Sequence, residues 1–106
     1  CSIYNLTPNI DLSNVTDISS MFESCTLFDS DISGFDISSV TAATDMLLLS
    51  GFSITNYNLL LPAWDAYGTS NVTFNAGTAH YSAGAPTTAR DAMVLRTWVI
   101  TDGGTP

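Results

Sequence analysis

The 106-residue sequence contains no lysine and only two arginines, against ten acidic residues, so its formal net charge is −8. A phosphate backbone is bound through lysine and arginine side chains that displace its counterions. The scarcity of cations therefore argues against nucleic-acid binding. It disfavours attachment to an anionic membrane surface for the same reason.

Long apolar runs are absent as well. A membrane-spanning helix needs about 20 mostly apolar residues, whereas the longest candidate here is MLLLSGF at residues 46–52. We therefore expect no membrane insertion. Few charges combined with many Ser, Thr, Asn and Gly residues are more typical of an extracellular repetitive β protein than of a cytosolic enzyme.

Residue types that carry catalysis or bind metals are scarce. His80, the only histidine, lies in the loop GTAHYSAG, and no serine is marked out as a nucleophile beside it. The two cysteines lack the histidine cluster of a zinc site. Asp29 and Asp31 alternate as calcium ligands can, but no further acids follow at ligand spacing, so we interpret them as solvated loop carboxylates. We expect no catalytic residues, no metal and no cofactor, and hence no enzyme.

What the sequence does contain is a repeat. SNVTDISSMFESC at residues 13–25 returns in altered form as SSVTAATDMLLLS at residues 38–50, an offset of 25 residues. A period near 25 with short β-type runs predicts coils stacked so that equivalent residues lie above one another. Cys1 falls inside such a unit and no signal peptide precedes it. We therefore expect the chain to be a mature or excised piece of something longer.

The repeat predicts a solenoid in which short parallel β-strands alternate with short helices or 3-10 turns. We expect one domain over residues 1–106. Repeats of about 25 residues occupy residues 1–50, and larger helical coils at residues 51–106 close the C-terminal end. In this arrangement Val15 and Val40 stack inside while Thr16 and Thr41 point outward.

The closing coils are expected to contain two helices and two strands. The first helix starts in TNYNLLLPAWDAYG with Thr55 as its cap and is broken or restarted at Pro62. A strand at Val72 to Phe74 follows, then a helix in PTTARDAMVLRT capped by Thr87 or Thr88, then a strand in WVITDGG. The predicted core comprises Phe28, Phe35, Phe52, Leu59, Leu60, Trp64, Ala89, Ala92, Met93, Leu95 and Trp98.

The segment DLSNVTDISSMFESCTLFDSDISGFDISSVT resembles the BspA-type leucine-rich repeat of bacterial surface proteins. NYNLLLPAW, NVTFNAGTAHYS and ARDAMVLRTWVITDGG are similar to the segment that closes those repeats, so the resemblance covers nearly the whole chain. Phe35 stands where the family has Trp, and the pattern fades after Thr41. The resemblance implies that the solenoid is of the leucine-rich repeat type, and it implies a role at a bacterial or phage surface.

Cys1 and Cys25 are near-equivalent positions of neighbouring coils. Stacking would bring their Cα atoms to about 5 Å, which a disulfide tolerates. The alternative is that both are reduced and pack as small hydrophobic side chains. The sequence leaves both readings open.

No convergent reactive group is evident, so we expect a non-enzymatic extracellular recognition or adhesion module that acts through its exposed face. Its partner would be a protein or glycan on a host or neighbouring cell. The alternative is a structural subunit or terminal domain of a filament, virion fibre or surface layer, self-assembling through an uncapped N-terminal coil. A weaker alternative is ice or polysaccharide binding through a threonine row. The predicted partner-facing residues are Thr16, Asp17, Glu23, Thr41 and Thr73.

Overall fold

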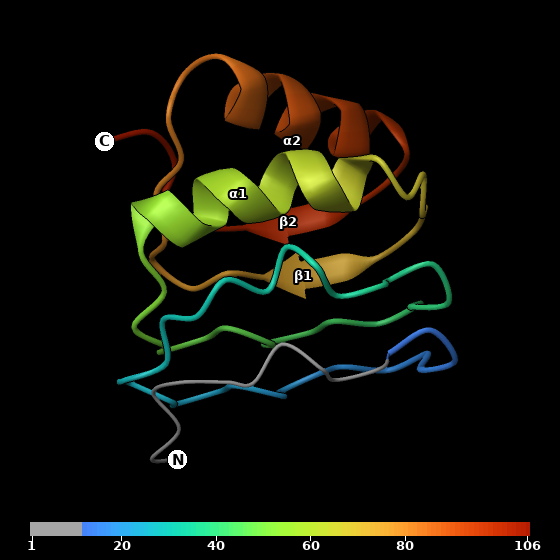
Figure 1. Ribbon diagram of the computed structural model, residues 1–106, viewed down its shortest axis with the longest axis horizontal. Coiled ribbons are helices and arrows are strands. Elements are labelled where there is room, and N and C mark those ends of the chain that lie inside the picture. Colours follow the sequence, from blue (N-terminus) through green and yellow to red (C-terminus); the bar gives the residue numbers. More distant parts are fainter. Residues whose placement is uncertain (1–11) are drawn as a thin grey trace.

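Two helices and two short strands form in the C-terminal part of the chain. The computed structural model describes residues 12–106, and its elements are α1 (Ile54–Asp65), β1 (Thr73–Asn75), α2 (Ala85–Leu95) and β2 (Val99–Thr101). The helices pack against each other, and β1 pairs with β2 in parallel (Figure 1). These are the two helices and two strands predicted for the closing segment, with shifted ends.

Helix α1 is capped by Ser53 rather than by the predicted Thr55. The Ser53 hydroxyl accepts a hydrogen bond from the Asn56 N–H at 3.2 Å, as an N-cap does. The carboxylate of Asp29 fixes this start, because it accepts the Ser53 N–H at 2.9 Å and the Asn56 side-chain amide at 2.8 Å. A residue 24 positions upstream therefore sets where the helix begins.

Pro62 lies inside α1 without ending it, contrary to the prediction. An interior proline removes a hydrogen bond and costs about 3 kcal/mol. A favourable contribution opposes this cost, because the side chains of Leu60, Leu61 and Trp64 are completely buried. Each such burial contributes roughly 1.5–3 kcal/mol or more, so packing outweighs the proline and the helix continues to Asp65.

Helix α2 also begins differently from the prediction. Its N-cap is Gly84, at φ 94°, while the Thr87 hydroxyl donates to the Ser82 carbonyl oxygen at 2.9 Å instead of capping the helix. The helix buries Ala89 and Met93 as expected. Leu95 was predicted to face the core but is 85% exposed, and Leu59 of α1 is 48% exposed.

The two copies of the repeated phrase run side by side in the same direction. Asp17 pairs with Ala42 in a parallel bridge, and Ala43 pairs with Phe74 of β1. Between the two copies, four backbone N–H groups donate to carbonyl oxygens at 2.8–2.9 Å: Ile18 to Ala42, Ser20 to Thr44, Phe22 to Met46 and Ser24 to Leu48. The repeat therefore produces parallel neighbouring segments, called runs below.

The predicted fold class, a leucine-rich repeat solenoid with a strand in each coil, is wrong. The described residues form a small compact body with two helices and one two-stranded parallel sheet. Turns are the physical reason. Ser20, Ser24, Asp45 and Leu49 have φ between 55° and 60°, a left-handed conformation that no continuous strand contains. In residues 12–50 the neighbouring runs are consequently chains of turns.

One core joins the turn-rich part to the helical part. Phe28 stacks on Phe22 with ring centroids 3.9 Å apart and lies parallel to Phe52 at 6.2 Å. Phe52 in turn contacts Tyr57 of α1. Of the predicted core, the members confirmed as buried are Phe28, Phe35, Phe52, Leu60, Trp64, Ala89, Met93 and Trp98.

Candidate functional site

One surface is built from the outward residues of the parallel runs. Asp17 lies beside Ala42, and the Ala43–Phe74 bridge places Ala42 beside Thr73, which pairs with Val99. The same register aligns a second row two residues further along. We call these two rows the threonine face, which comprises Asp17, Ala42, Thr73 and Val99 in one row and Ser19, Thr44, Asn75 and Thr101 in the other.

Thr16 and Thr41 lie next to each other where their runs begin. Both are exposed. The Thr41 hydroxyl donates to the Thr16 carbonyl oxygen at 3.1 Å, and the Thr41 N–H donates to the same oxygen at 2.7 Å. Thr73 is exposed too, but its register partner is Ala42, so the three threonines do not form one straight row.

Asp17 is the exposed carboxylate of the threonine face. Its Oδ1 accepts the Ser19 N–H at 2.9 Å. Hydrogen bonds from Ser19, first from its side chain and then from its backbone, hold the pKa of Asp17 below its ordinary value. Asp17 is therefore a negative charge held in a defined place at neutral pH.

Glu23 lies further along the first run. Its N–H donates to the Ser20 carbonyl oxygen at 3.2 Å in a turn, and its side chain is half-buried. It belongs to neither row of the threonine face. Of the five predicted partner-facing residues, Asp17 and Thr73 share a row, Thr16 and Thr41 adjoin it, and Glu23 lies apart.

Cys25 is buried, with 1% of its side chain exposed, and it is disulfide-bonded. Cys1, the other cysteine of the chain, lies outside the described residues. The pairing of these two residues therefore stays a prediction, which mass spectrometry of the unreduced, digested chain can check.

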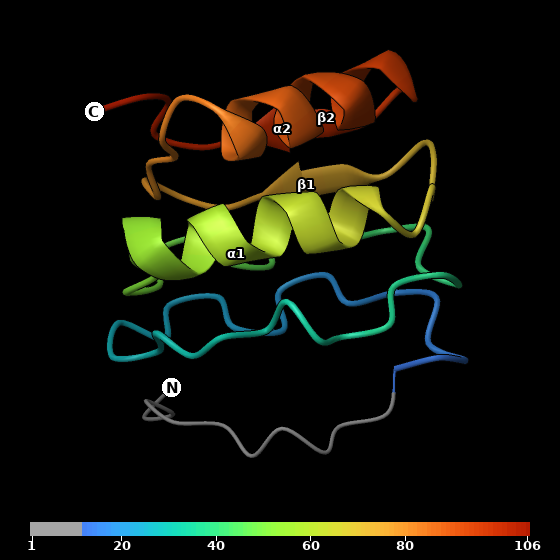
Figure 2. The same ribbon diagram turned by 45° about the horizontal axis from the view of Figure 1, so that its top comes forward.

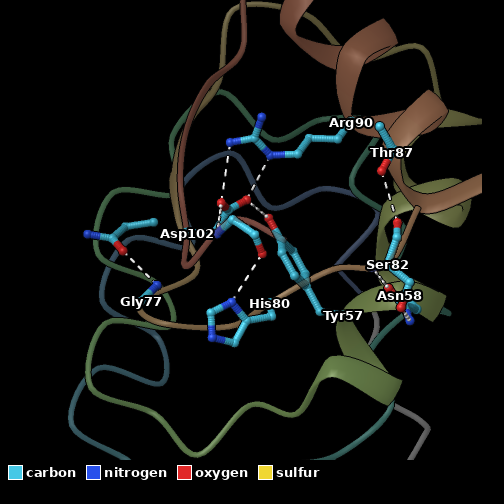
Figure 3. Close-up of polar contacts among 10 residues, drawn as sticks. Tyr57, Asn58, Gly77, His80, Ser82, Thr87, Arg90 and Asp102 are labelled. Atoms are coloured by element: carbon cyan, nitrogen blue, oxygen red, sulfur yellow. Dashed lines mark hydrogen bonds and ion pairs between the residues drawn. The ribbon is translucent and has the colours of Figure 1, made fainter. Parts of the chain in front are cut away.

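A buried polar cluster that the sequence did not indicate surrounds Asp102 (Figure 3). Tyr57 of α1 donates its hydroxyl to Asp102 Oδ2 at 2.6 Å, and Arg90 of α2 donates its Nε–H to the same oxygen at 2.8 Å. The Gly104 N–H donates to Oδ1 at 2.9 Å. The guanidinium of Arg90 also lies 5.0 Å from the centre of the Tyr81 ring. The cluster therefore ties both helices to the C-terminal segment.

Electrostatics fix the protonation of this cluster. Burial, followed by the hydrogen bond to Asp102 and its negative charge, raises the pKa of Tyr57 far above its ordinary value. Burial alone would lower the pKa of Arg90, but the hydrogen bond and charge of Asp102 outweigh it and raise the pKa. The Tyr57 hydroxyl thus remains a hydrogen-bond donor and Arg90 a cation, which suits them to hold segments together.

His80 and Asn58 extend the polar contacts around this end of α1 (Figure 3). His80 is exposed, as predicted for a surface loop, and its Nδ1 lies 3.1 Å from the Gly104 carbonyl oxygen. The Asn58 side chain donates to the Ser82 hydroxyl at 2.9 Å and accepts the Ser82 N–H at 2.9 Å. The polar groups of His80 and Asn58 thus contact other residues of the same chain.

The carboxylates of Asp29 and Asp31 are used internally. Asp29 is an exposed loop carboxylate, as predicted, and in addition it anchors the start of α1. Asp31 Oδ1 accepts the Ser33 N–H at 2.9 Å. Within residues 12–106 no three His, Cys, Asp or Glu side chains are grouped as metal ligands, and no pocket is found.

Comparison with protein families gives one match. Residues 3–81 match the family described as "Mycoplasma protein of unknown function, DUF285". The chain belongs to this family. Membership in DUF285 is consistent with the resemblance to BspA-type surface repeats, and the match extends from the turn-rich runs through α1 and β1 to Tyr81. No curated protein and no solved structure matches the chain significantly.

The two helices in the described part of this DUF285 chain have 12 and 11 residues. None of its helices combines the length and apolar character required to span a bilayer.

Proposed function

We propose that this chain is a non-enzymatic, extracellular recognition or adhesion module at a cell or virion surface. It binds a protein or glycan of a host or neighbouring cell through the threonine face. Membership in a family whose repeats resemble those of bacterial surface proteins supports this role. The proposal concerns the chain's own surface, because fold and family do not identify a ligand.

The observation that carries the proposal is the alignment of exposed side chains across neighbouring runs. Asp17, Thr73 and Val99 share one row, and Thr44 and Thr101 belong to the next. All five side chains are exposed, while the intervening residues Ile18, Ala43 and Phe74 are buried in the core. A rigid backbone thus presents hydroxyl, methyl and carboxylate groups at fixed spacings.

The composition of this face favours a partner with hydrogen-bonding groups. Neighbouring positions within a row are about 4.8 Å apart, the separation of paired strands. Thr44, Thr73 and Thr101 each offer a hydroxyl that can donate or accept, beside their methyl groups. Neither arginine belongs to the face, since Arg90 and Arg96 are paired with Asp102 and Asp65. Neutral glycans and polar or basic protein surfaces suit it best.

The experiment uses the purified chain against an array of cell-surface glycans and a panel of extracellular matrix proteins, with affinity then measured by surface plasmon resonance. Thr73→Arg places a bulky cation within the threonine face. It should weaken binding at least about tenfold, because a misfitting charged side chain in an interface must be desolvated. Thr88→Arg, at an exposed position of α2, is the matched control and should bind like the wild type.

Two results would contradict the proposal. In the first, Thr73→Arg binds the ligand as tightly as the wild type does, whereas Thr88→Arg binds it more weakly. The binding site would then lie on the helices. The other is hydrolysis of a glycan or peptide at enzymatic rates by the purified chain.

A structural role is the second candidate. The chain would then serve as a subunit or terminal domain of a filament, virion fibre or surface layer. An unpaired strand edge at β2 favours it, since such edges pair readily with another chain. The other predicted assembly contact is the N-terminal coil. That coil includes residues 1–11, which lie outside the described residues, so this contact stays a prediction.

A further inference from the structure

Strand β2 has a free edge. Its Val99 N–H donates to the Val72 carbonyl oxygen at 2.9 Å, and its Thr101 carbonyl oxygen accepts the Ala76 N–H at 2.8 Å. Hydrogen-bonding direction alternates along a strand, so the N–H and C=O of Ile100 point away from β1. Within the described residues no strand lies beside that edge.

Exposed apolar side chains lie at the start of β2 and in the segment that leads into it. Val99 is 61% exposed, and Leu95 at the end of α2 is 85% exposed. A tight turn keeps these residues at the same end of the molecule, because the Trp98 N–H donates back to the Met93 carbonyl oxygen at 3.1 Å and the Thr97 N–H to that of Val94 at 3.0 Å. Val94 itself is 45% exposed. An edge strand beside such side chains is suited to pair with another chain.

The distribution of charge decides which chain can approach. Figure 2 shows α2 and β2 together at one end of the molecule, with residues 12–50 toward the opposite end. Residues 51–106 hold both arginines and three carboxylates, and two of these carboxylates are paired with the arginines. Residues 12–50 hold no arginine and six carboxylates: Asp17, Glu23, Asp29, Asp31, Asp36 and Asp45.

Two copies meeting at their β2 ends would keep the acidic segments far apart. Salt screens exposed charges beyond about 10 Å at 0.1 M ionic strength, whereas the molecule measures 34 Å along two of its axes. A head-to-tail contact would instead bring the acidic segment of one copy onto the other. Charge therefore favours a symmetric contact between like ends.

We propose that β2 is the contact strand of a two-fold symmetric dimer, in which β2 of a second copy pairs antiparallel with its free edge. Ile100 lies at the symmetry axis and exchanges both backbone hydrogen bonds with Ile100 of the second copy. Val99 then lies opposite Thr101 of the second copy. A two-fold contact of this kind closes on itself and builds a dimer without a filament.

Analytical ultracentrifugation of the full chain over a range of concentrations tests this proposal. The wild type should show a concentration-dependent dimer and no larger polymer. Val99→Glu should weaken dimerisation about tenfold or more, since it brings two added carboxylates together as diagonal neighbours on either side of the axis, with no cation opposite either of them. The matched control is Leu27→Glu, because Leu27 is also 61% exposed but lies in the acidic segment; it should leave dimerisation unchanged.

A second variant makes the pairing register testable. The double variant V99K/T101E should restore the dimer that V99E loses, because each lysine lies opposite a glutamate of the second copy in the antiparallel arrangement. Circular dichroism checks that each variant is folded. In the wild type, hydrogen exchange at the Ile100 amide should slow as concentration rises.

A wild type that is monomeric at every concentration would overturn the proposal. So would a dimer that L27E weakens and V99E does not, or one in which exchange at Ile100 is independent of concentration. None of these results depends on ligand binding at the threonine face, so the dimer and the proposed function are tested separately.

Discussion

Three carboxylates of residues 12–50 and two of residues 51–106 are used in different ways. In the first region Asp17, Asp31 and Asp36 each accept the N–H of the serine two residues later at 2.9 Å. In the second region Asp102 and Asp65 pair with arginines at 2.8 and 2.7 Å. The first use shapes a local turn and requires no cation, whereas the second joins segments that are distant in sequence.

This difference explains how a chain with two arginines can carry ten acids and still fold. Short-range hydrogen bonds to backbone N–H groups stabilise ionised carboxylates where no cation is present. Both cations can then serve the region where helices must be held against the C-terminal segment. The two regions nevertheless share a core through the aromatic contacts of Phe28 and Phe52.

The largest expected effect breaks that shared core. Phe28→Ala removes a completely buried ring that stacks on Phe22 at 3.9 Å, and it should lower the free energy of unfolding by about 3–5 kcal/mol. Urea unfolding followed by far- and near-ultraviolet circular dichroism should show one earlier transition for both signals. Leu27→Ala, at an exposed neighbour, should change stability by less than about 0.5 kcal/mol. If the helices of F28A unfolded at the urea midpoint of the wild type, the two regions would have separate cores.

A smaller effect is expected from the ion pair of the second region. Asp102→Asn keeps the shape of the side chain but removes the charge that Arg90 and Tyr57 contact. We expect a loss of roughly 1.5–3 kcal/mol, the range for hydrogen bonds to charged groups. Asp91→Asn, at an exposed position of α2, is the control and should be nearly neutral. Equal urea midpoints for D102N and D91N would contradict the role of the cluster.

The smallest effect concerns alkaline pH and again falls on the second region. The pKa of Tyr57 is raised in the folded state by burial and by Asp102, whereas unfolded tyrosine titrates near pH 10. The stabilisation is therefore complete below about pH 10 and is lost as pH rises above it, because only the unfolded chain releases this proton. The free energy of unfolding should begin to fall near pH 10 and should continue to fall as the pH is raised further.

Tyr57→Phe should remove most of that pH dependence, while Tyr67→Phe, at a residue 40% exposed, should retain it. The measurement is urea unfolding at a series of alkaline pH values. If the free energy of unfolding of Y57F fell with rising pH as steeply as that of the wild type, another group would be responsible for the effect.

The repeat could be predicted well because its consequences are local and periodic. Matching phrases 25 residues apart were enough to place Thr16 beside Thr41, and Asp17 and Thr73 on an exposed surface. The strands expected within the repeat were wrong. Left-handed residues at Ser20 and Asp45 recur at the same offset, and nothing in the identity of serine or aspartate alone requires that conformation.

Element ends and the buried cluster escaped prediction because distant residues decide them. The start of α1 depends on Asp29, and the continuation of the helix past Pro62 depends on what Trp64 packs against. Arg90 and Asp102 were visible as opposite charges, but their contact with Tyr57 requires residues 45 positions apart to meet.

By itself the sequence determined the period, the membership of most of the core, the two helices and two strands of the closing segment, and the scarcity of cations. These follow from residue type and spacing, which act over a few neighbouring positions. Only the tertiary structure decided that turns replace strands in residues 12–50, that Asp102 joins the two helices, and that β2 ends with a free edge. Those features depend on which distant groups compete for the same hydrogen bonds and the same buried space.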